Sequence, residues 1–224
     1  LVSGEGLIRP LAFGAQGRRS ALRGTAVPFN RGIADLHFDG AKNTWRLTAF
    51  DPDDTHEGFR EDLDRFYAAA AWAEILLNIH GGGTESQALF ELAAPAFSLM
   101  SLAAGDEISR LKTAFLWKLL EVEGIRPDPM VCGRCGSAMP VGAGSGTAGF
   151  TGNGLLCCSS CSESRGMALP DGARRWLEAV SPASLGDAMK LGLPPAAMKA
   201  AESWLLAVVQ SLLERPLKSL RVSS

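Results

Sequence analysis

The sequence predicts an α+β fold, in which a region of short strands is followed by a helical body interrupted by an inserted cysteine module. Three observations support this prediction. Residues 6–50 form short segments separated by Gly-rich turns, with no helical pattern between them. After residue 60, apolar residues recur every three or four positions, as on the buried face of a helix. Four of the five cysteines form two C-x₂-C pairs. We therefore expect three parts: residues 1–52, residues 53–130 with 166–224, and residues 131–165.

The first fifty residues predict a small antiparallel barrel or sandwich. Residues 7–13 read as a strand that lies at an edge or carries a bulge because it contains Pro10, and residues 25–29 read as a short second strand. Residues 34–38 and 45–49 alternate apolar and polar side chains, and Asp39-Gly40 between them is a turn signal. Because the sequence starts at Leu1, close to the first strand-like segment, we expect a leader or a further strand to precede it.

The helical body is predicted to follow Asp51-Pro52, which is a turn signal that ends the strands. Pro95 predicts a kink or a break in the second helix. Gly124, followed closely by a proline, ends the third. The segments expected to be helical begin near Glu61, Thr84, Gly105, Pro170 and Pro195.

Composition narrows the class of protein. The chain is 46% hydrophobic and 21% charged, as is typical of globular domains. Its longest apolar runs are far shorter than a membrane span, and no signal peptide is recognisable. Few cysteines, most of them in metal-ligand spacing, indicate a reducing compartment, so we expect a cytoplasmic protein.

The cysteine module predicts a structural zinc site. Cys132-Gly-Arg-Cys135 and Cys158-Ser-Ser-Cys161 are separated by roughly twenty residues, which is the spacing of a tetrahedral four-thiolate site with no open position. Disulfides, a redox pair or free thiols are the alternatives, and none has its usual sequence context here. Cys157 lies next to Cys158, and the x₂ spacing favours Cys158 as the ligand.

Charge is distributed unevenly along the chain, although the net charge is only −2. Residues 1–50 carry seven Lys and Arg side chains against three Asp and Glu, so the remainder is acidic. The loop that contains Gly14 and Gly17 turns tightly, and the arginines that follow it favour phosphate contact. Three aromatic residues near this loop are candidates for base stacking, although their alternation with polar residues favours a place in the barrel core: Phe13, Phe29 and Trp45.

No pattern indicates an enzyme, since no nucleophile elbow, zinc-protease motif or phosphate loop is present. His37, His56 and His80 are scattered, and we expect them to be surface or structural residues. The acidic residues between 51 and 64 are better explained by favourable interaction with a helix N-terminus than by a nuclease metal site. A non-catalytic protein is therefore expected.

The chain resembles a known bacterial family. Residues 6–20, which read Gly-Leu-Ile-Arg-Pro-Leu-Ala-Phe-Gly-Ala-Gln-Gly-Arg-Arg-Ser, are similar to the amino-terminal part of RecO recombination mediators. Pro28-Phe29 and Trp45-Arg-Leu-Thr48 fit the same family, as do the helical middle, the paired cysteines and the ending Arg215-Pro-Leu-Lys-Ser219. The resemblance covers most of the chain, and the order of its parts carries the argument more than any single motif.

The resemblance implies an OB-fold, here without its first strand, followed by a helical domain with an inserted zinc module. It also implies binding to single- and double-stranded DNA, strand annealing, and work with RecR and single-strand binding protein to load RecA, near the nucleoid. The DNA-binding residues would be Arg9, Arg18, Arg19, Arg23, Arg31, Lys42 and Arg46. The competing interpretation is a zinc-containing protein–protein adaptor that binds no nucleic acid, and a metal-dependent nuclease ranks third.

Overall fold

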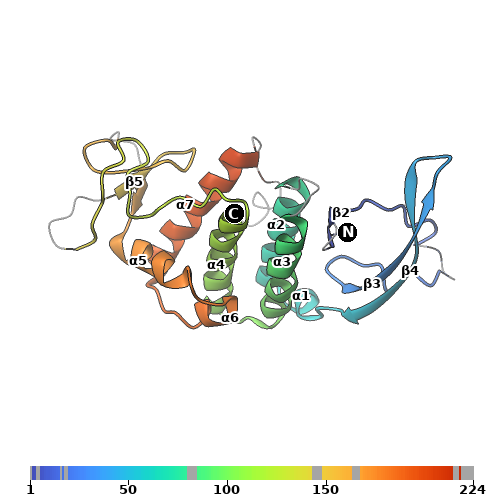
Figure 1. The fold of residues 1–224 in the computed structure, drawn as a ribbon. Coiled ribbons are helices and arrows are strands. Elements are labelled where there is room, and N and C mark those ends of the chain that lie inside the picture. The colour runs from blue at the N-terminus through green and yellow to red at the C-terminus, as the bar shows by residue number, and fades with distance from the viewer. Residues whose placement is uncertain are drawn as a thin grey trace. The chain divides into compact units, whose positions relative to one another are not determined.

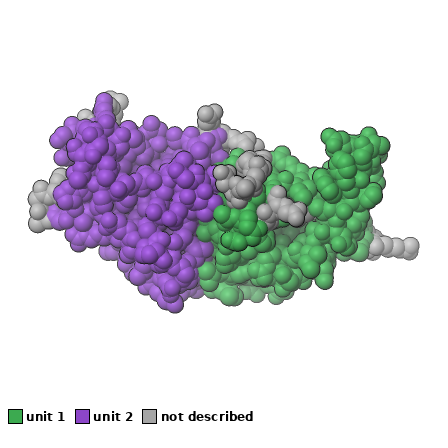
Figure 2. Space-filling view, in the orientation of Figure 1, with its two compact units in different colours: residues 1–102 green, residues 103–224 purple. Residues whose placement is uncertain are grey.

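The computed structural model divides the chain into two compact units (Figure 2). Unit 1 comprises Leu1–Leu102 and unit 2 comprises Ala103–Ser224. Helices that we predicted to form one domain therefore fall in both units, and the three-part division of the chain stays a prediction. The residues that the structure describes are 2–3, 6–15, 17, 20–79, 85–142, 148–162, 167–213 and 217.

A long antiparallel hairpin dominates the strand region of unit 1 (Figure 1). It pairs β3 (Arg31–Asp39) with β4 (Thr44–Asp54), and Phe38 lies directly opposite Trp45. The short strands β1 (Val2–Ser3) and β2 (Gly6–Leu7) form a separate antiparallel pair. Leu11 adds one parallel bridge to β4, in which its N–H donates to the Trp45 carbonyl at 2.8 Å.

The strands of the described part of unit 1 do not close into a barrel, so the OB-fold is not confirmed. The predicted strand at residues 25–29 is wrong, because this segment forms turns and Phe29 has a left-handed φ of 70°. The predicted strand at residues 7–13 is reduced to β2 and the Leu11 bridge. Pro52 does not end β4, since the ladder tolerates this proline next to a register shift.

In the described residues of unit 1, the hairpin is followed by three helices, namely α1 (Gly58–Glu61), α2 (Leu63–Ile79) and α3 (Glu85–Leu102). Asp62 caps α2, because its Oδ1 accepts from the backbone N–H groups of Asp64 and Arg65 at 2.8 and 3.0 Å. The helix α3 continues through Pro95, where a kink or break was predicted. Rings from four segments form an aromatic cluster in this unit: Phe29, Phe59, Phe66, Trp72 and Phe97.

Unit 2 is organised around α4 (Asp106–Val122) and α7 (Pro195–Leu213), which pack together (Figure 1). The rings of Trp117 and Trp204 lie 6.1 Å apart in their shared core. The helix α4 ends at the predicted Gly124, which has a φ of 68°. Two short helices lie between the cysteine module and α7 in the chain. These are α5 (Asp171–Val180), which was predicted, and α6 (Leu185–Ala188), which was not. No helix in the described ranges is long and apolar enough to cross a membrane.

Candidate metal centre and nucleic-acid interface

The cysteine module of unit 2 is built on a three-stranded antiparallel sheet. Its strands are β5 (Ala148–Phe150), β6 (Leu156–Cys157) and β7 (Met167–Leu169), in the order β6-β5-β7. The two cysteine pairs lie just outside these strands, one before β5 and one directly after β6. The sheet therefore fixes the second pair, and hydrogen bonds to β6 position the first.

The first pair sits in a tight turn. The Cys132 N–H donates to the Ser137 carbonyl at 2.9 Å, and the Gly136 N–H donates to the Cys132 carbonyl at 2.9 Å. Gly136 has a φ of 71°, a conformation that a residue with a side chain rarely adopts. This glycine lets the chain reverse immediately after Cys135, so that both sulfurs point to one side of the turn.

The second pair forms a matching turn. The N–H groups of Cys161 and Ser162 donate to the Cys158 carbonyl at 3.0 and 2.8 Å. Two bonds tie the turns to each other: the Gly133 N–H donates to the Leu156 carbonyl at 2.8 Å, and the Cys158 N–H donates to the Cys132 Sγ at 3.3 Å. The backbone thus brings the two pairs together.

The four predicted ligands converge on one point. The Sγ atoms of Cys132, Cys135, Cys158 and Cys161 all lie within 4.8 Å of one another, and those of Cys135 and Cys158 are 3.9 Å apart. A tetrahedral Zn²⁺ with Zn–S bonds of about 2.3 Å needs sulfurs about 3.8 Å apart, whereas a disulfide needs about 2.05 Å. The geometry therefore fits a metal ion better than disulfides.

The protonation of the thiols also favours a cation. Hydrogen bonds from the backbone N–H groups of Cys135 and Cys158 lower the pKa of Cys132 to about 6. Hydrogen bonding with the thiols of Cys135 and Cys158 raises the pKa of Cys161 to about 12. Four crowded sulfurs cannot all ionise without a compensating charge, and a bound divalent cation supplies that charge. This group could hold a structural Zn²⁺, with no open position for a substrate.

Cys157 lies outside the four-cysteine group. It belongs to β6 and is only 2% exposed. Burial raises the pKa of its thiol, as does the neighbouring charge of Cys132. Because successive residues of a strand point to opposite faces, Cys158 rather than Cys157 turns toward the other pair. The structure therefore agrees with the x₂ spacing on which of the two joins the group.

Two anchors join the module to the helices of unit 2. Arg174 of α5 is fully buried; its Nε donates to the Pro129 carbonyl at 2.8 Å, and its Nη2 donates to the Met139 carbonyl. The Trp204 indole of α7 donates to the Gly154 carbonyl at 2.8 Å. Sequence analysis missed Arg174, although an arginine between Ala173 and Leu177 on the apolar side of a helix is an available signal.

The predicted DNA-binding residues are spread over the strands and loops of unit 1. Arg9, Arg23 and Lys42 have exposed side chains. Arg31 is paired with Asp53 at 3.1 Å, and Arg46 is paired with Asp39. These two ion pairs reduce the positive charge that the hairpin offers to a phosphate. The other two predicted residues, Arg18 and Arg19, lie outside the described residues, and all seven assignments stay predictions.

The three aromatic residues that were candidates for base stacking differ in their burial. Phe29 packs in the aromatic cluster, as the core interpretation predicted. Phe13 and Trp45 are 63% and 40% exposed, so the core interpretation is wrong for them, because the strands of the described residues form no closed barrel that would cover them. Phe38, which was not singled out for base stacking, lies opposite Trp45 with ring centroids 5.0 Å apart and is 46% exposed.

Two of the three histidines, His37 and His56, have the surface or structural positions that we expected. His37 is exposed, and His80 lies outside the described residues. His56 is buried: its Nδ1 lies 2.6 Å from the Phe29 carbonyl oxygen, and its Nε2 lies 3.2 Å from both Ser98 Oγ and Asp54 Oδ2. Serine, histidine and carboxylate meet here, but the backbone carbonyl occupies Nδ1 and the carboxylate contacts Nε2. This is not the arrangement of a catalytic triad.

Comparison with known proteins identifies the family. The family model described as "Recombination protein O C terminal" matches residues 60–221. The "DNA repair protein RecO" of Roseiflexus sp. is 29% identical over 214 residues, which cover 95% of this chain and 73% of that protein. The protein of the same name from Rubrobacter xylanophilus is 29% identical over 206 residues, or 90% of this chain and 80% of that one.

The corresponding protein of Alkaliphilus metalliredigens is 28% identical over 131 residues, and the match covers 58% of this chain. The matched segment spans about half, 52%, of the length of that relative. The family model covers most of unit 2, including the paired cysteines, together with α2, α3 and the end of α1 in unit 1. The chain therefore belongs to the RecO family of recombination proteins.

Proposed function

We propose that this chain is a non-catalytic DNA repair and recombination mediator that binds DNA through unit 1. Its membership of the RecO family supports the biological role, since the relatives are named DNA repair proteins. The proposal includes strand annealing and, together with RecR and single-strand binding protein, loading of RecA in the cytoplasm at the nucleoid. These finer activities follow from the family resemblance alone. The OB-fold is likewise proposed from the family resemblance alone.

The exposed Phe38–Trp45 pair carries the nucleic-acid part of the proposal. Two aromatic rings from facing strands offer a sequence-tolerant platform for unpaired bases. On the other face of β4, since successive strand residues alternate, the Arg46 guanidinium lies 5.2 Å from the centroid of the exposed Phe13 ring. Adjacent exposed aromatic rings are a common feature of binding surfaces, and a base supplies a flat apolar face that stacks on them.

The cations that contact phosphates are those whose charge is not already paired. Arg9, Arg23 and Lys42 meet this condition, because their side chains make no ion pair with a described residue. Arg18 and Arg19 are assigned to the same role by the resemblance. We expect a smaller contribution from Arg31 and Arg46, since a phosphate would have to compete with Asp53 and Asp39 for them.

Fluorescence anisotropy with a labelled single-stranded oligonucleotide tests the proposal. We expect affinity to fall as salt rises, because phosphate contacts release counterions. The double substitution Phe38→Ala with Trp45→Ala should weaken binding about tenfold, and should weaken binding to a duplex less, because paired bases are already stacked. Leu63→Ala, which removes an exposed apolar side chain from α2, is the matched control. Absence of binding at low salt contradicts the proposal.

One observation favours the adaptor as a second candidate. Unit 1 contains 13 acidic and nine basic residues, and ten of the acidic residues lie in residues 51–102. Such a charge repels DNA and attracts a basic protein surface. If the oligonucleotide does not bind at any salt concentration, the adaptor becomes the better interpretation of unit 1.

A further inference from the structure

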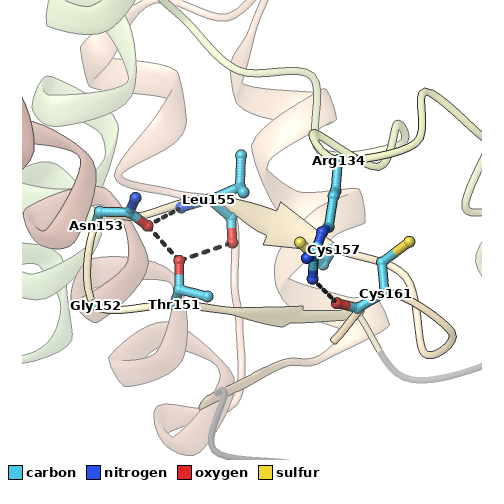
Figure 3. Close-up of a pocket in the computed structure, with 7 residues that line it drawn as sticks. All are labelled: Arg134, Thr151, Gly152, Asn153, Leu155, Cys157 and Cys161. Carbon is cyan, nitrogen blue, oxygen red and sulfur yellow. Dashed lines mark hydrogen bonds between the residues drawn. The ribbon is translucent and has the colours of Figure 1, made fainter. Parts of the chain in front are cut away.

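A pocket of about 440 Å³ lies beside the cysteine group in unit 2 (Figure 3). Arg134, which lies between the first two cysteines, forms one side of it, and the turn between β5 and β6 forms the other. Cys157 and Cys161 complete the lining. We propose that this pocket receives an unpaired nucleobase, which makes the zinc module a second nucleic-acid contact separate from the hairpin. The proposal extends the nucleic-acid binding proposed above to another unit.

The turn that forms one wall is held in place by its own hydrogen bonds. Asn153 Oδ1 accepts from the Thr151 hydroxyl and from the Leu155 N–H, the latter at 3.4 Å. The Thr151 N–H donates to the Leu155 carbonyl at 3.1 Å, and Trp204 secures the Gly154 carbonyl from α7. Both ends of the turn are therefore fixed before any ligand arrives.

This arrangement leaves a directed donor at the pocket. Because Asn153 Oδ1 is occupied by the turn, the Nδ2 group points away from Thr151, as Figure 3 shows. Within the described part of the chain, Nδ2 makes no hydrogen bond. A side-chain amide is a donor that suits the carbonyl oxygen or ring nitrogen at the edge of a base. Asn153 would therefore donate a hydrogen bond to the edge of the base, while Leu155 and Arg134 contact its faces.

The walls suit the flat faces of a base. Leu155 is 39% exposed and offers an apolar surface next to Asn153. Arg134 donates to the Cys161 carbonyl at 3.3 Å, which orients its planar guanidinium at the pocket. Guanidinium planes stack on unpaired bases, and they do so without the exact edge matching that hydrogen bonds need.

Charge distinguishes a base from a phosphate as the occupant. With a divalent cation bound, the four thiolates would keep a net negative charge, and Cys161 is part of both the cysteine group and the pocket lining. A phosphate placed inside would be repelled by this group and would have one arginine to compensate it. A neutral base avoids that repulsion, while the phosphates of the strand stay outside in water.

Gly152 provides a way to close the pocket without disturbing the fold. A Cβ added there meets no atom within 4 Å, and the residue does not have a left-handed φ. Gly152 lines the pocket, so Gly152→Leu adds a bulky apolar side chain to the lining, and its Cβ meets no neighbouring atom. Gly192 has the same open surroundings elsewhere in unit 2, so Gly192→Leu is the matched control. Asn153→Asp keeps Oδ1 as the acceptor for the turn and replaces the N–H donors with a negatively charged acceptor oxygen.

The experiment is an NMR titration of the zinc-loaded full chain with dAMP, dCMP, dGMP and dTMP, and then with a single-stranded oligonucleotide. We expect saturable shifts of the Asn153 side-chain amide and the Leu155 backbone amide. Gly152→Leu should weaken this binding about tenfold or more, as expected for loss of a stacked base, and Gly192→Leu should leave it unchanged. Asn153→Asp should weaken it with no change in zinc content.

Two results would overturn the inference: no shift at these amides with any of the probes, or equal affinity in the Gly152→Leu protein. A free nucleotide and a nucleotide within a DNA strand present the same base to the pocket, so the experiment must distinguish between them. Tighter binding of the oligonucleotide than of every mononucleotide identifies the strand as the source, and equal affinity identifies the free nucleotide. If the NMR titration shows no binding but anisotropy still shows salt-dependent DNA binding, only the pocket proposal is wrong. If neither experiment shows binding, the proposed function is wrong as well.

Discussion

The two units of this protein are stabilised by different kinds of interaction. Unit 1 combines an open hairpin with three helices, exposes aromatic residues on its strands, and carries more acidic than basic residues. Unit 2 buries two tryptophans between α4 and α7, contains 13 basic and 11 acidic residues, and brings four cysteines to one point. Aromatic packing and a small polar network hold unit 1 together, whereas unit 2 has a site for a metal cross-link.

The two units use their aromatic and charged side chains differently: unit 1 exposes them at its surface, whereas unit 2 buries several of them. In unit 1, the hairpin exposes the rings of Phe38 and Trp45, and its arginines Arg31 and Arg46 are paired with aspartates. In unit 2, a buried arginine and a buried tryptophan use their donors to fix loops rather than ligands. We therefore expect the hairpin to bind a ligand at its surface, and the buried polar groups of unit 2 to hold its loops in place.

The largest effect expected is loss of the metal cross-link. Cys132→Ser or Cys158→Ser should release zinc and destabilise unit 2 by more than about 3 kcal/mol, because a structural zinc site contributes folding free energy directly. Metal analysis and thermal unfolding followed by tryptophan fluorescence measure the two effects. Cys157→Ala is the control and should retain zinc, since Cys157 lies outside the four-cysteine group. Unchanged metal content in the serine variants would show that the cysteines do not hold a metal.

The second largest effect is expected at the buried anchor of the module. Arg174→Met should destabilise unit 2 by about 3 kcal/mol, because it removes the donor of two backbone carbonyls and breaks the ion pair with Asp171. Chemical denaturation measures the loss. Arg175→Met, at an exposed neighbouring position, should change stability by less than about 0.5 kcal/mol. Equal stability of the two variants would contradict an anchoring role for Arg174.

A smaller and pH-dependent effect is expected in unit 1. Burial acts to raise the pKa of Asp54, but the His56 N–H, the Ser98 hydroxyl and the charges of His56 and Arg31 outweigh it and lower that pKa. A carboxyl whose pKa is lower in the folded state stabilises the protein above its unfolded pKa of about 4, and this contribution is lost as pH falls through the folded value.

Acid unfolding of the parent protein and of Asp54→Asn, followed by circular dichroism between pH 2 and 7, tests this expectation. The variant should be less stable near neutral pH by about 1 kcal/mol, and it should lose less stability below about pH 4. Asp35→Asn, at an exposed position on β3, is the control. Parallel acid-unfolding curves for the parent protein and Asp54→Asn would contradict the role of Asp54.

The smallest effect expected is that of a single phosphate contact. Lys42→Ala should weaken DNA binding similarly for all sequences and should reduce the slope of log affinity against log salt by about 1. Lys190→Ala is the control, because Lys190 is an exposed lysine of unit 2 that is paired with Asp187 at 3.2 Å. An unchanged slope for Lys42→Ala would assign the phosphate contacts to other cations.

Sequence analysis predicted the local features well, and the physical reason is that they depend on nearby residues. The C-x₂-C spacing forces two sulfurs into each turn, and Gly136 follows the second cysteine where a left-handed residue is needed. Periodicity and end signals placed α4 and α7, and Pro170 marked the start of α5. For Cys157 and Cys158, spacing alone led to the choice that the structure also makes.

Only the tertiary structure decided the features that depend on distant parts of the chain. Alternation on β3 and β4 predicts which side chains share a face, but the absence of a closed barrel in the described residues determines that Phe13 and Trp45 meet solvent. The ion pairs of Arg31 and Arg46 join residues that only the hairpin register brings together. Arg174 could be buried because carbonyls more than thirty residues away accept its protons. Burial, pairing and pocket shape are properties of the folded chain, since each depends on contacts between residues far apart in sequence.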